Sequence, residues 1–487
     1  MQGCEVKFAV HIGLDAPTMA VEPLHELVRM VQADLDKHSD SNIHRLHVTP
    51  ASRDPQRGRA IPQTEIPAGD QAADVTKPQL TVTVKALPEH SVDGPIANLL
   101  PFSPDLEVFH DAVIKSDDLS LRALSTFLAS ELVQVFEEER TTITHLLAAD
   151  HAFARGLGLQ EQSLPTYESQ KRSNRAFRYA TTYHLTFSLF SGSANPSAWE
   201  IKRALDEYLA PFLESFSPIS TFTIDTQVQL YASLSSSMQG PSYDEASSRW
   251  TLMQTDLSAF INAAEWPLSP SIGAGPTINF VLYVPSEDQS PLVVESGGTS
   301  WLIPQWGGVQ IFNPASYSSE NGTLLDKHAL EPVMRIFADQ LDSMLGLPQS
   351  PPSLPLRLSS LARERTASLI LSASSTLGAL ARLTLKLTAI AIPDNVARSV
   401  TYSIQNLEQA CDDIGKGRFD KALEHARSAE SHAEQAFFDP SMVGQVYFPD
   451  EHKVAVYVPL LGPMAVPLVM AAIKEIKKMR QARTLGH

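Results

Sequence analysis

The stretch 454–473 near the C-terminus carries no formal charge, and it constrains the fold of this chain more than any other segment. About 20 apolar residues in a helix suffice to cross the roughly 30 Å hydrocarbon core of a bilayer. Three prolines, Pro459, Pro463 and Pro467, recur in it at every fourth position. In a water-exposed helix each would cost about 3 kcal/mol, because proline lacks an N–H and its ring clashes with the preceding turn. A membrane helix tolerates them, since neighbouring helices can satisfy the freed carbonyls.

We therefore predict a membrane span here, and the spacing of the prolines places their rings on one face. That face is a candidate contact with the membrane helices of a partner. Basic residues follow the span, whereas Asp450 and Glu451 precede it, so the positive-inside bias predicts a short cytosolic tail within 450–487. The rest of the chain would then face the lumen or exterior. A buried core helix, or an extended segment interrupted by proline, remains the alternative.

The composition, with 487 residues of which 43% are hydrophobic, allows a large core. A net charge of -17 argues against nucleic acid as a partner, because nucleic-acid binders concentrate Lys and Arg on one face. Two cysteines, Cys4 and Cys411, provide neither a disulfide framework nor a thiolate metal cluster; a bond between them is allowed but not required. No N-terminal signal is visible, because charge and proline interrupt 7–24. We therefore expect that an upstream anchor is missing from this chain.

The first part of the chain, 1–346, predicts an α/β body whose mixed open sheet is flanked by helices. Apolar periodicity predicts strands at 5–13 and 79–85, and helices at 24–35 and 121–136. The proline-containing segment 51–78 lacks a period and is interpreted as a flexible insertion. A clear βαβ unit follows, with strands at 183–189 and 222–230 and a helix at 201–216, and such units normally pair their strands in parallel.

Two further strands are predicted, at 278–284 and within 301–313. The second contains Trp306, Gly307 and Gly308, where a large aromatic beside two glycines indicates either a packing site or the landing site of a partner. The proline-rich run 347–355 is interpreted as a linker that opens a helical region, 347–449. Its helices are predicted at 361–387, 396–414 and 419–437, and it leads into the span.

The sequence contains no catalytic motif of the metalloprotease, hydrolase-elbow, phosphate-loop or CxxC kind. Cys411 is followed by Asp412 and Asp413, whose negative charge would raise its pKa and disfavour a thiolate nucleophile. His425 and His432 lie seven positions apart on a predicted helix, too far to share one metal ion. We thus assign no catalytic, cofactor or metal residue. One glycosylation sequon, at Asn321, stands in a polar loop.

Four segments together resemble the PIG-S family, a subunit of the glycosylphosphatidylinositol (GPI) transamidase. They are YHLTFSL at 183–189, INFVLYVP at 278–285, QWGGV at 305–309 and AFFDPSMVGQVYFPDEHKVAVYVPLLGPMAVP at 436–467. The last is the most specific, because a proline-studded span that follows FFDP and FPDEHK is not a generic composition. The resemblance covers most of the chain from about residue 183 onward and is weaker before it. One departure is that the N-terminal span of the family is absent from this sequence.

The resemblance implies a non-catalytic, structural or substrate-orienting subunit of an endoplasmic-reticulum complex. That complex removes a C-terminal signal from a precursor protein and joins the new carboxyl end to GPI. The catalytic cysteine would lie on PIG-K, with PIG-T, PIG-U and GPAA as further partners and the bulk of the chain in the lumen. Two alternatives stay open: a luminal α/β hydrolase whose catalytic residues are scattered in sequence, and a tail-anchored cytosolic adaptor.

Overall fold

A computed structural model describes residues 7–38, 44–51, 78–87, 95–111, 118–148, 172, 174–232, 240–257, 275–314, 324–386, 392–440 and 450–484. The chain divides into two compact units. The first consists of Glu5–Ala367 with Ile414–Leu423, and the second of Ser368–Asp413 and Glu424–His487 with Met1–Cys4. The predicted insertion at 51–78 lies almost wholly outside the described residues.

The first unit contains two five-stranded sheets where the sequence predicts one mixed sheet. The N-terminal sheet has the order β2-β1-β3-β5-β4. Its strands are β1 (Phe8–Asp15), β2 (His44–Pro50), β3 (Leu80–Lys85), β4 (Ile96–Leu99) and β5 (Asp105–Phe109). All pairs are parallel except β4 with β5. The predicted strands at 5–13 and 79–85 are thus confirmed, and the polar or short strands β2, β4 and β5 are additions.

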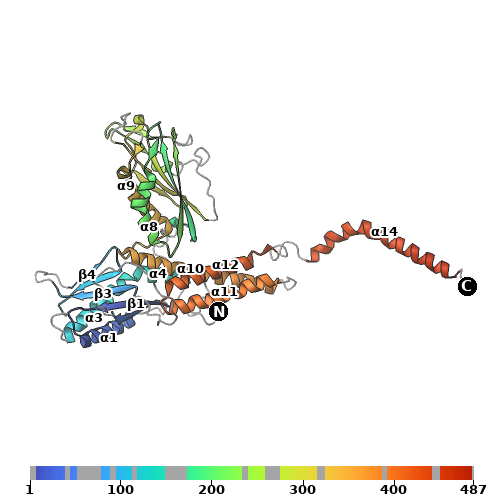
Figure 1. Cartoon of the computed structure of the whole chain (residues 1–487), viewed down its shortest axis with the longest axis horizontal. Helices are drawn as coiled ribbons and strands as arrows, with labels where there is room; N and C mark the ends of the chain where they lie inside the picture. The colour runs from blue at the N-terminus through green and yellow to red at the C-terminus, as the bar shows by residue number, and fades with distance from the viewer. Residues whose placement is uncertain are drawn as a thin grey trace, which may run out of the picture. The chain divides into compact units, whose positions relative to one another are not determined.

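The described helices in this part of the chain include α1 (Val21–His38), α3 (Asp118–Val135) and α4 (Glu137–Ala148). The predicted helices at 24–35 and 121–136 correspond to α1 and α3. These two lie side by side (Figure 1), and the Ser125 hydroxyl of α3 donates a hydrogen bond of 2.9 Å to Asp34 of α1. Leucines on α3 face the core because they recur at helical spacing, which is the pattern from which the helix was predicted.

The second sheet has the order β13-β14-β11-β6-β8, and its centre is the predicted βαβ unit. Its strands are β6 (Thr182–Ser191), β8 (Thr221–Gln229), β11 (Thr277–Val284), β13 (Ser300–Ile303) and β14 (Gly307–Ile311). β6 and β8 pair in parallel, as predicted, and only β13 runs antiparallel to its neighbour. Between them α7 (Ile201–Ala204), a π-helical turn (Leu205–Leu209) and α8 (Ala210–Ser215) form the crossover.

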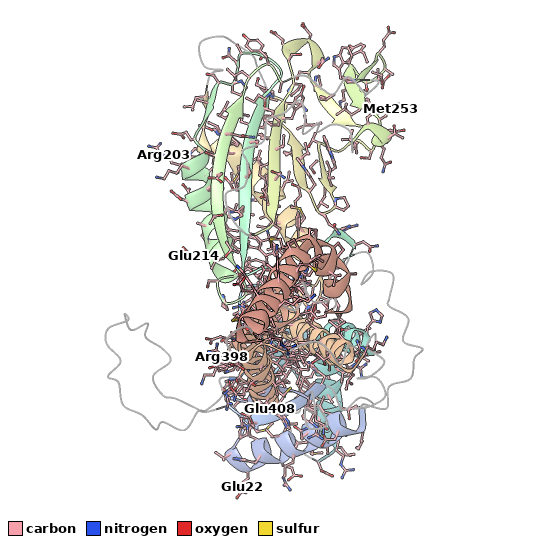
Figure 2. The ribbon with its side chains drawn as sticks, turned by 90° about the vertical axis from the view of Figure 1, so that its right-hand side faces the viewer. Glu22, Arg203, Glu214, Met253, Arg398 and Glu408 are labelled. Atoms are coloured by element: carbon pink, nitrogen blue, oxygen red, sulfur yellow. The ribbon has the colours of Figure 1, made fainter. Side chains whose placement is uncertain are left out.

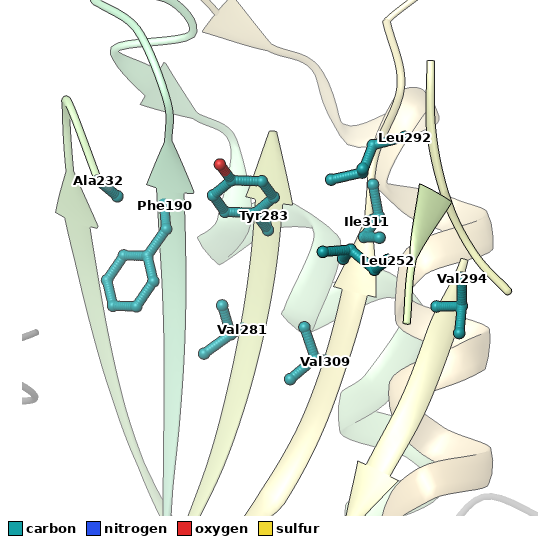
Figure 3. Packing of buried hydrophobic residues seen from close by; sticks show 9 residues of the cluster. All are labelled: Phe190, Ala232, Leu252, Val281, Tyr283, Leu292, Val294, Val309 and Ile311. Atoms are coloured by element: carbon teal, nitrogen blue, oxygen red, sulfur yellow. The ribbon is translucent and has the colours of Figure 1, made fainter. Parts of the chain in front are cut away.

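The two faces of this sheet are covered differently. Phe187 and Phe280 stack at 5.0 Å on one face, beneath Phe337 of α9 (Lys327–Leu345). On the other face, nine buried residues form a cluster around Val281 and Tyr283 (Figure 3). A small sheet of β9 (Ser242–Asp244), β10 (Arg249–Leu252) and β12 (Leu292–Val294) contributes three of them. A further parallel pair is formed by β7 (Ala198–Trp199) and β15 (Leu324–Leu325).

The predicted linker at 347–355 is a packed segment in the structure. Gly346 ends α9 in the left-handed conformation, with φ of 73°, and Leu347 directly after it is fully buried. The Ser353 hydroxyl donates to the Ser103 carbonyl at 2.8 Å, and the Ser350 N–H donates to Glu138 at 2.8 Å. Proline-rich composition therefore marks a turn here whose polar groups are satisfied within the first unit.

The C-terminal helices are α10 (Leu354–Lys386), α11 (Asp394–Gly415), α12 (Phe419–Phe437) and α14 (Asp450–Thr484), in agreement with the predicted helical region. In the second unit, α11 and α12 are joined by a hydrogen bond of 2.7 Å from the Ser403 hydroxyl to the Ala429 carbonyl. Small residues allow this approach, since Ala429 and Ala433 are fully buried. Figure 2 labels Arg398 and Glu408 on α11.

A buried ion pair connects distant parts of the first unit. The Arg363 guanidinium of α10 donates two hydrogen bonds to Glu139 of α4, at 2.5 and 2.6 Å, and His44 of β2 lies 3.2 Å from the same carboxylate. The guanidinium also lies 4.9 Å from the ring centre of Phe419, which stacks on Phe8 of β1. Burial alone would raise the pKa of Glu139, but the charge and hydrogen bonds of Arg363 and His44 hold that pKa well below its usual range.

A second carboxylate, Glu364, lies beside this pair. Both oxygens of Glu364 accept hydrogen bonds from Arg172, at 3.0 and 3.1 Å. Burial nevertheless raises the pKa of Glu364 to about 7, because desolvation outweighs the attraction of Arg172 and the negative Glu139 lies near. The adjacent α10 residues Arg363 and Glu364 thus both find their polar partners inside the first unit.

Replacing Arg363 by methionine is expected to lower the free energy of unfolding by about 3–5 kcal/mol, because it leaves the Glu139 carboxylate buried without its partner. The double variant Glu139→Gln, Arg363→Met should lose less than the single one, since no uncompensated charge remains. Urea unfolding of the purified chain, followed by tryptophan fluorescence, measures both. Arg335→Met, which breaks the exposed pair with Glu331, is the control. Equal losses for Arg363→Met and Arg335→Met would contradict the expectation.

Candidate interaction surfaces

The predicted site residues fall on two parts of the described structure and one part outside it. Trp306, Gly307 and Gly308 lie at the turn from β13 into β14. The three prolines lie within α14. Asn321 lies outside the described residues, so its predicted glycosylation stays a prediction.

The predicted membrane span is part of one helix, α14, which continues through all three prolines and bends along its length (Figure 1). Pro459, Pro463 and Pro467 are exposed, as are the large apolar side chains described around them. These are Val456, Tyr457, Val458, Leu461, Met464, Val466, Leu468, Val469, Met470 and Ile473. Neither alternative from the sequence, a buried core helix or an extended segment, matches this geometry. A helix that exposes apolar side chains along its length is suited to apolar surroundings.

A second helix is relevant to any membrane assignment. Among the described residues, α10 is long and apolar enough to cross a membrane by length and composition, and the bent pair α3 and α4 passes only if taken as one span. The first half of α10, however, contains Arg363 and Glu364, whose charges are paired inside the first unit. Within α14, the side chains of 450–454, 460 and 481–484 lie outside the described residues to which that finding applies.

The paired glycines of β14 are explained by two close approaches. A Cβ on Gly307 would lie 1.9 Å from the Asn279 carbonyl oxygen of β11. A Cβ on Gly308 would lie 1.9 Å from the Gln340 side-chain oxygen of α9. Gln340 is buried and its amide donates to the carbonyls of Trp301 and Val309, at 3.0 and 3.3 Å. The glycines therefore allow α9 to approach β14, and this packing role needs no partner protein.

Trp306 occupies the turn before these glycines. The backbone N–H of Trp306 donates to the Ile303 carbonyl at 3.1 Å, and the backbone carbonyl of Trp306 accepts from the backbone N–H of Asn279 at 3.1 Å. The indole is half-buried against the cluster of Figure 3, together with Trp250 and Trp301. A half-buried tryptophan at the rim of a core supports the protein's own packing and leaves part of its ring accessible. The landing site for a partner at Trp306, Gly307 and Gly308 stays a prediction.

The residues weighed for catalysis take other roles in the described structure. Cys411 is disulfide-bonded and therefore presents no thiolate; the only other cysteine, Cys4, lies outside the described residues. His425 lies 3.1 Å from the Asn406 side-chain oxygen and 3.7 Å from Asp413. The ring of His432 lies 5.5 Å from that of Tyr402. The two histidines thus have separate neighbours, in the second unit.

Sequence reasoning missed the polar ladder that joins β6 to β8. Hydroxyl, imidazole and amide groups pair across the strands: Thr182 with Thr221, His184 with Thr223, and Ser188 with Gln227. The alternation that predicted both strands contains these residues as its polar positions, so the signal was present. Without the register, however, their pairing could not be inferred, and neither could the edge position of β8.

Gly308→Ala is expected to lower the free energy of unfolding by about 1–3 kcal/mol, because the new methyl displaces the Gln340 amide from its two carbonyl partners. Gly298→Ala is the matched control, since its Cβ would meet only the Ser296 hydroxyl at 3.8 Å. Thermal unfolding of both purified variants checks this. Equal melting temperatures for the two variants would show that α9 does not depend on the missing side chain.

Comparison with known proteins identifies the family. The family model described as phosphatidylinositol-glycan biosynthesis class S protein matches residues 1–482. The GPI-anchor transamidase component PIGS of Rattus norvegicus is 29% identical over 394 residues, covering 72% of this chain and 70% of that protein. The Homo sapiens component of the same name is 30% identical, covering 66% of this chain and 61% of that protein. The GPI transamidase component GPI17 of Saccharomyces cerevisiae is 30% identical, covering 63% of this chain and 60% of that protein. This chain belongs to the PIG-S family.

Proposed function

We propose that the chain is a non-catalytic subunit of the GPI transamidase, the endoplasmic-reticulum complex that attaches GPI to the C-terminus of precursor proteins. The observation that carries this proposal is family membership over nearly the whole chain, with relatives that are named as components of that transamidase. Its role in the complex is structural or substrate-orienting. Its partners are the homologues of PIG-K, PIG-T, PIG-U and GPAA, and the catalytic cysteine lies on PIG-K.

The chemistry of the described residues supports an accessory role. Cys411 is held in a disulfide, so the one described cysteine is not a nucleophile. Glu139 and Glu364, two of the carboxylates with strongly shifted pKa values, serve a buried ion-pair network around Arg363. A third, Asp342, whose pKa burial raises to about 6, pairs with Arg357. Perturbed groups at active sites usually lie in clefts that a substrate can enter. Here they are enclosed between packed helices, as a structural network requires.

The membrane arrangement forms the second part of the proposal. The exposed apolar length of α14 supports a span at 454–473, with the basic tail in the cytosol and the first unit in the lumen. A disulfide at Cys411 also supports a luminal location for the part of the chain before α14, because disulfides persist in oxidising compartments and are rare in the cytosol. The three exposed prolines then face other subunits' helices inside the bilayer.

If the first unit is luminal, the full-length protein from native membranes should be N-glycosylated at Asn321. Endoglycosidase treatment is then expected to increase its gel mobility by the equivalent of one glycan, because glycosylation occurs only in the lumen. Asn321→Gln should migrate at the shifted position without treatment. A protein that is unaffected by the enzyme, and cleaved by protease added to intact microsomes, would place this body in the cytosol and favour an adaptor.

Replacing Pro459, Pro463 and Pro467 together by leucine should leave membrane insertion intact but weaken assembly, because leucine restores helix hydrogen bonds and changes the shape of the contact face. The tagged wild type should co-purify with the PIG-K and PIG-T homologues from detergent extracts, and the triple variant should recover several-fold less of them. Resistance to alkaline extraction controls for insertion. Normal recovery by the triple variant would leave α14 as a plain anchor, whereas a wild type without either partner would contradict the proposed function.

A further inference from the structure

Within the described residues, the second sheet ends on one side in a long edge strand. In this part of the chain β8 is the terminal strand and pairs with β6, and Figure 3 shows it outermost beside the strand of Phe190. It runs in unbroken parallel register from Thr221 to Gln229. Most of its side chains are exposed, including Ile224 at 40% and Val228 at 41%. An edge of this length and regularity is a template for another strand.

The register determines which backbone groups of β8 point outward. The Thr221 N–H donates to the Thr181 carbonyl at 2.8 Å, so Thr221 directs its groups toward β6. Because successive residues of a strand alternate, the odd-numbered residues of β8 bond to β6 and the even-numbered ones turn away. The outward N–H and C=O groups belong to Phe222, Ile224, Thr226 and Val228.

The other outer strands of the two five-stranded sheets differ from β8 in capping or in length. The Gln32 side chain of α1 caps β2 of the N-terminal sheet, accepting from the Val48 N–H at 3.0 Å and donating to the Leu46 carbonyl at 3.1 Å. The opposite edges, β4 and β13, are four residues long. β8 contains nine residues without lysine or proline, which often block edge pairing, and Asp225 is its one charged residue.

The side chains of β8 define the chemistry of a matching strand. Its even residues lie on the helix-covered face, where Phe222 contacts Phe216 and Tyr183, and Ile224 and Val228 expose β-branched apolar surface. Its odd residues lie on the other face with the polar ladder, and Asp225 is the charged residue among them. A strand alternating apolar residues with polar or basic ones would complement both faces.

We propose that the β8 edge binds an extended strand of another subunit, which adds to the sheet through the backbone groups of Phe222, Ile224, Thr226 and Val228. This inference rests on the proposed function, since the strand comes from a component of the same complex. The fixed spacing of these donors and acceptors selects an extended polypeptide over a helix or a small ligand. Asp225 favours a strand with a lysine or arginine opposite it.

Thr226→Pro tests the proposal in the full chain, because Thr226 directs its N–H outward and proline removes that donor without breaking a bond to β6. The variant should recover several-fold less of the partner that supplies the strand, and Thr226→Val, which keeps the N–H, is the matched control. Thermal unfolding verifies that the sheet remains folded. In parallel, hydrogen exchange of the wild type compares the assembled complex with the isolated chain. The fast-exchanging half of the amides in 221–229 should slow by about tenfold or more on assembly.

The outcomes separate the inference from the proposed function. If wild type recovers the PIG-K and PIG-T homologues but the β8 amides stay unprotected and Thr226→Pro assembles normally, the edge is not a docking site while the subunit role stands. If wild type recovers neither homologue, the proposed function itself fails. If two differently tagged copies of this chain co-purify and Thr226→Pro abolishes that pairing, the occupant is a second copy, which overturns the assignment to another subunit.

Discussion

The buried pair of Arg363 and Glu139 holds the first unit together across its sequence. The two residues are 224 positions apart, yet the guanidinium is fully enclosed and contacts α4 as well as the ring of Phe419. Through His44 and Phe8 the same cluster reaches two strands of the N-terminal sheet. A buried charge without its partner costs several kcal/mol, whereas alternative arrangements of apolar side chains differ by less. The pair therefore penalises arrangements that would separate α4 from α10.

The two sheets show how this chain combines a closed part with an open one. In the N-terminal sheet, Gln32 bonds to two backbone groups at the edge of β2, so a side chain of the same chain caps that edge. The second sheet ends at β8, a strand whose residues are mostly exposed and whose even-numbered backbone groups point away from β6. A soluble monomer gains nothing from such an edge and risks aggregation. A component of an assembly has a use for it, and the family relationship gives the open edge its context.

The periodicity of apolar residues predicted the helices and strands whose two faces differ in polarity. It did not predict mostly polar strands or the contacts between distant elements. The crossover helix and strands β6 and β8 were predicted because their apolar residues recur at fixed spacing. β2 was not, since its sequence HRLHVTP is mostly polar and only two of its residues are buried. Glu139 stands in the run EEER, which is typical of a solvated helix start, and its partner could not be inferred across 224 positions. The glycine pair was predicted to mark a packing site or a partner's landing site, but Gln340, which packs against Gly308, belongs to a different element and could not be inferred.

The prolines of α14 acquire a physical meaning from the helix that contains them. Each proline frees the carbonyl four residues earlier, so the acceptors without helix donors are those of Ala455, Pro459 and Pro463, on the face that the rings share. Hydrocarbon offers no donor, whereas water would compete and favour unwinding. In the proposed complex these donors come from polar side chains on neighbouring helices. The prolines that make α14 a poor helix in water therefore define one contact face in a membrane. That face carries the carbonyl groups that lack a hydrogen-bond donor within the helix.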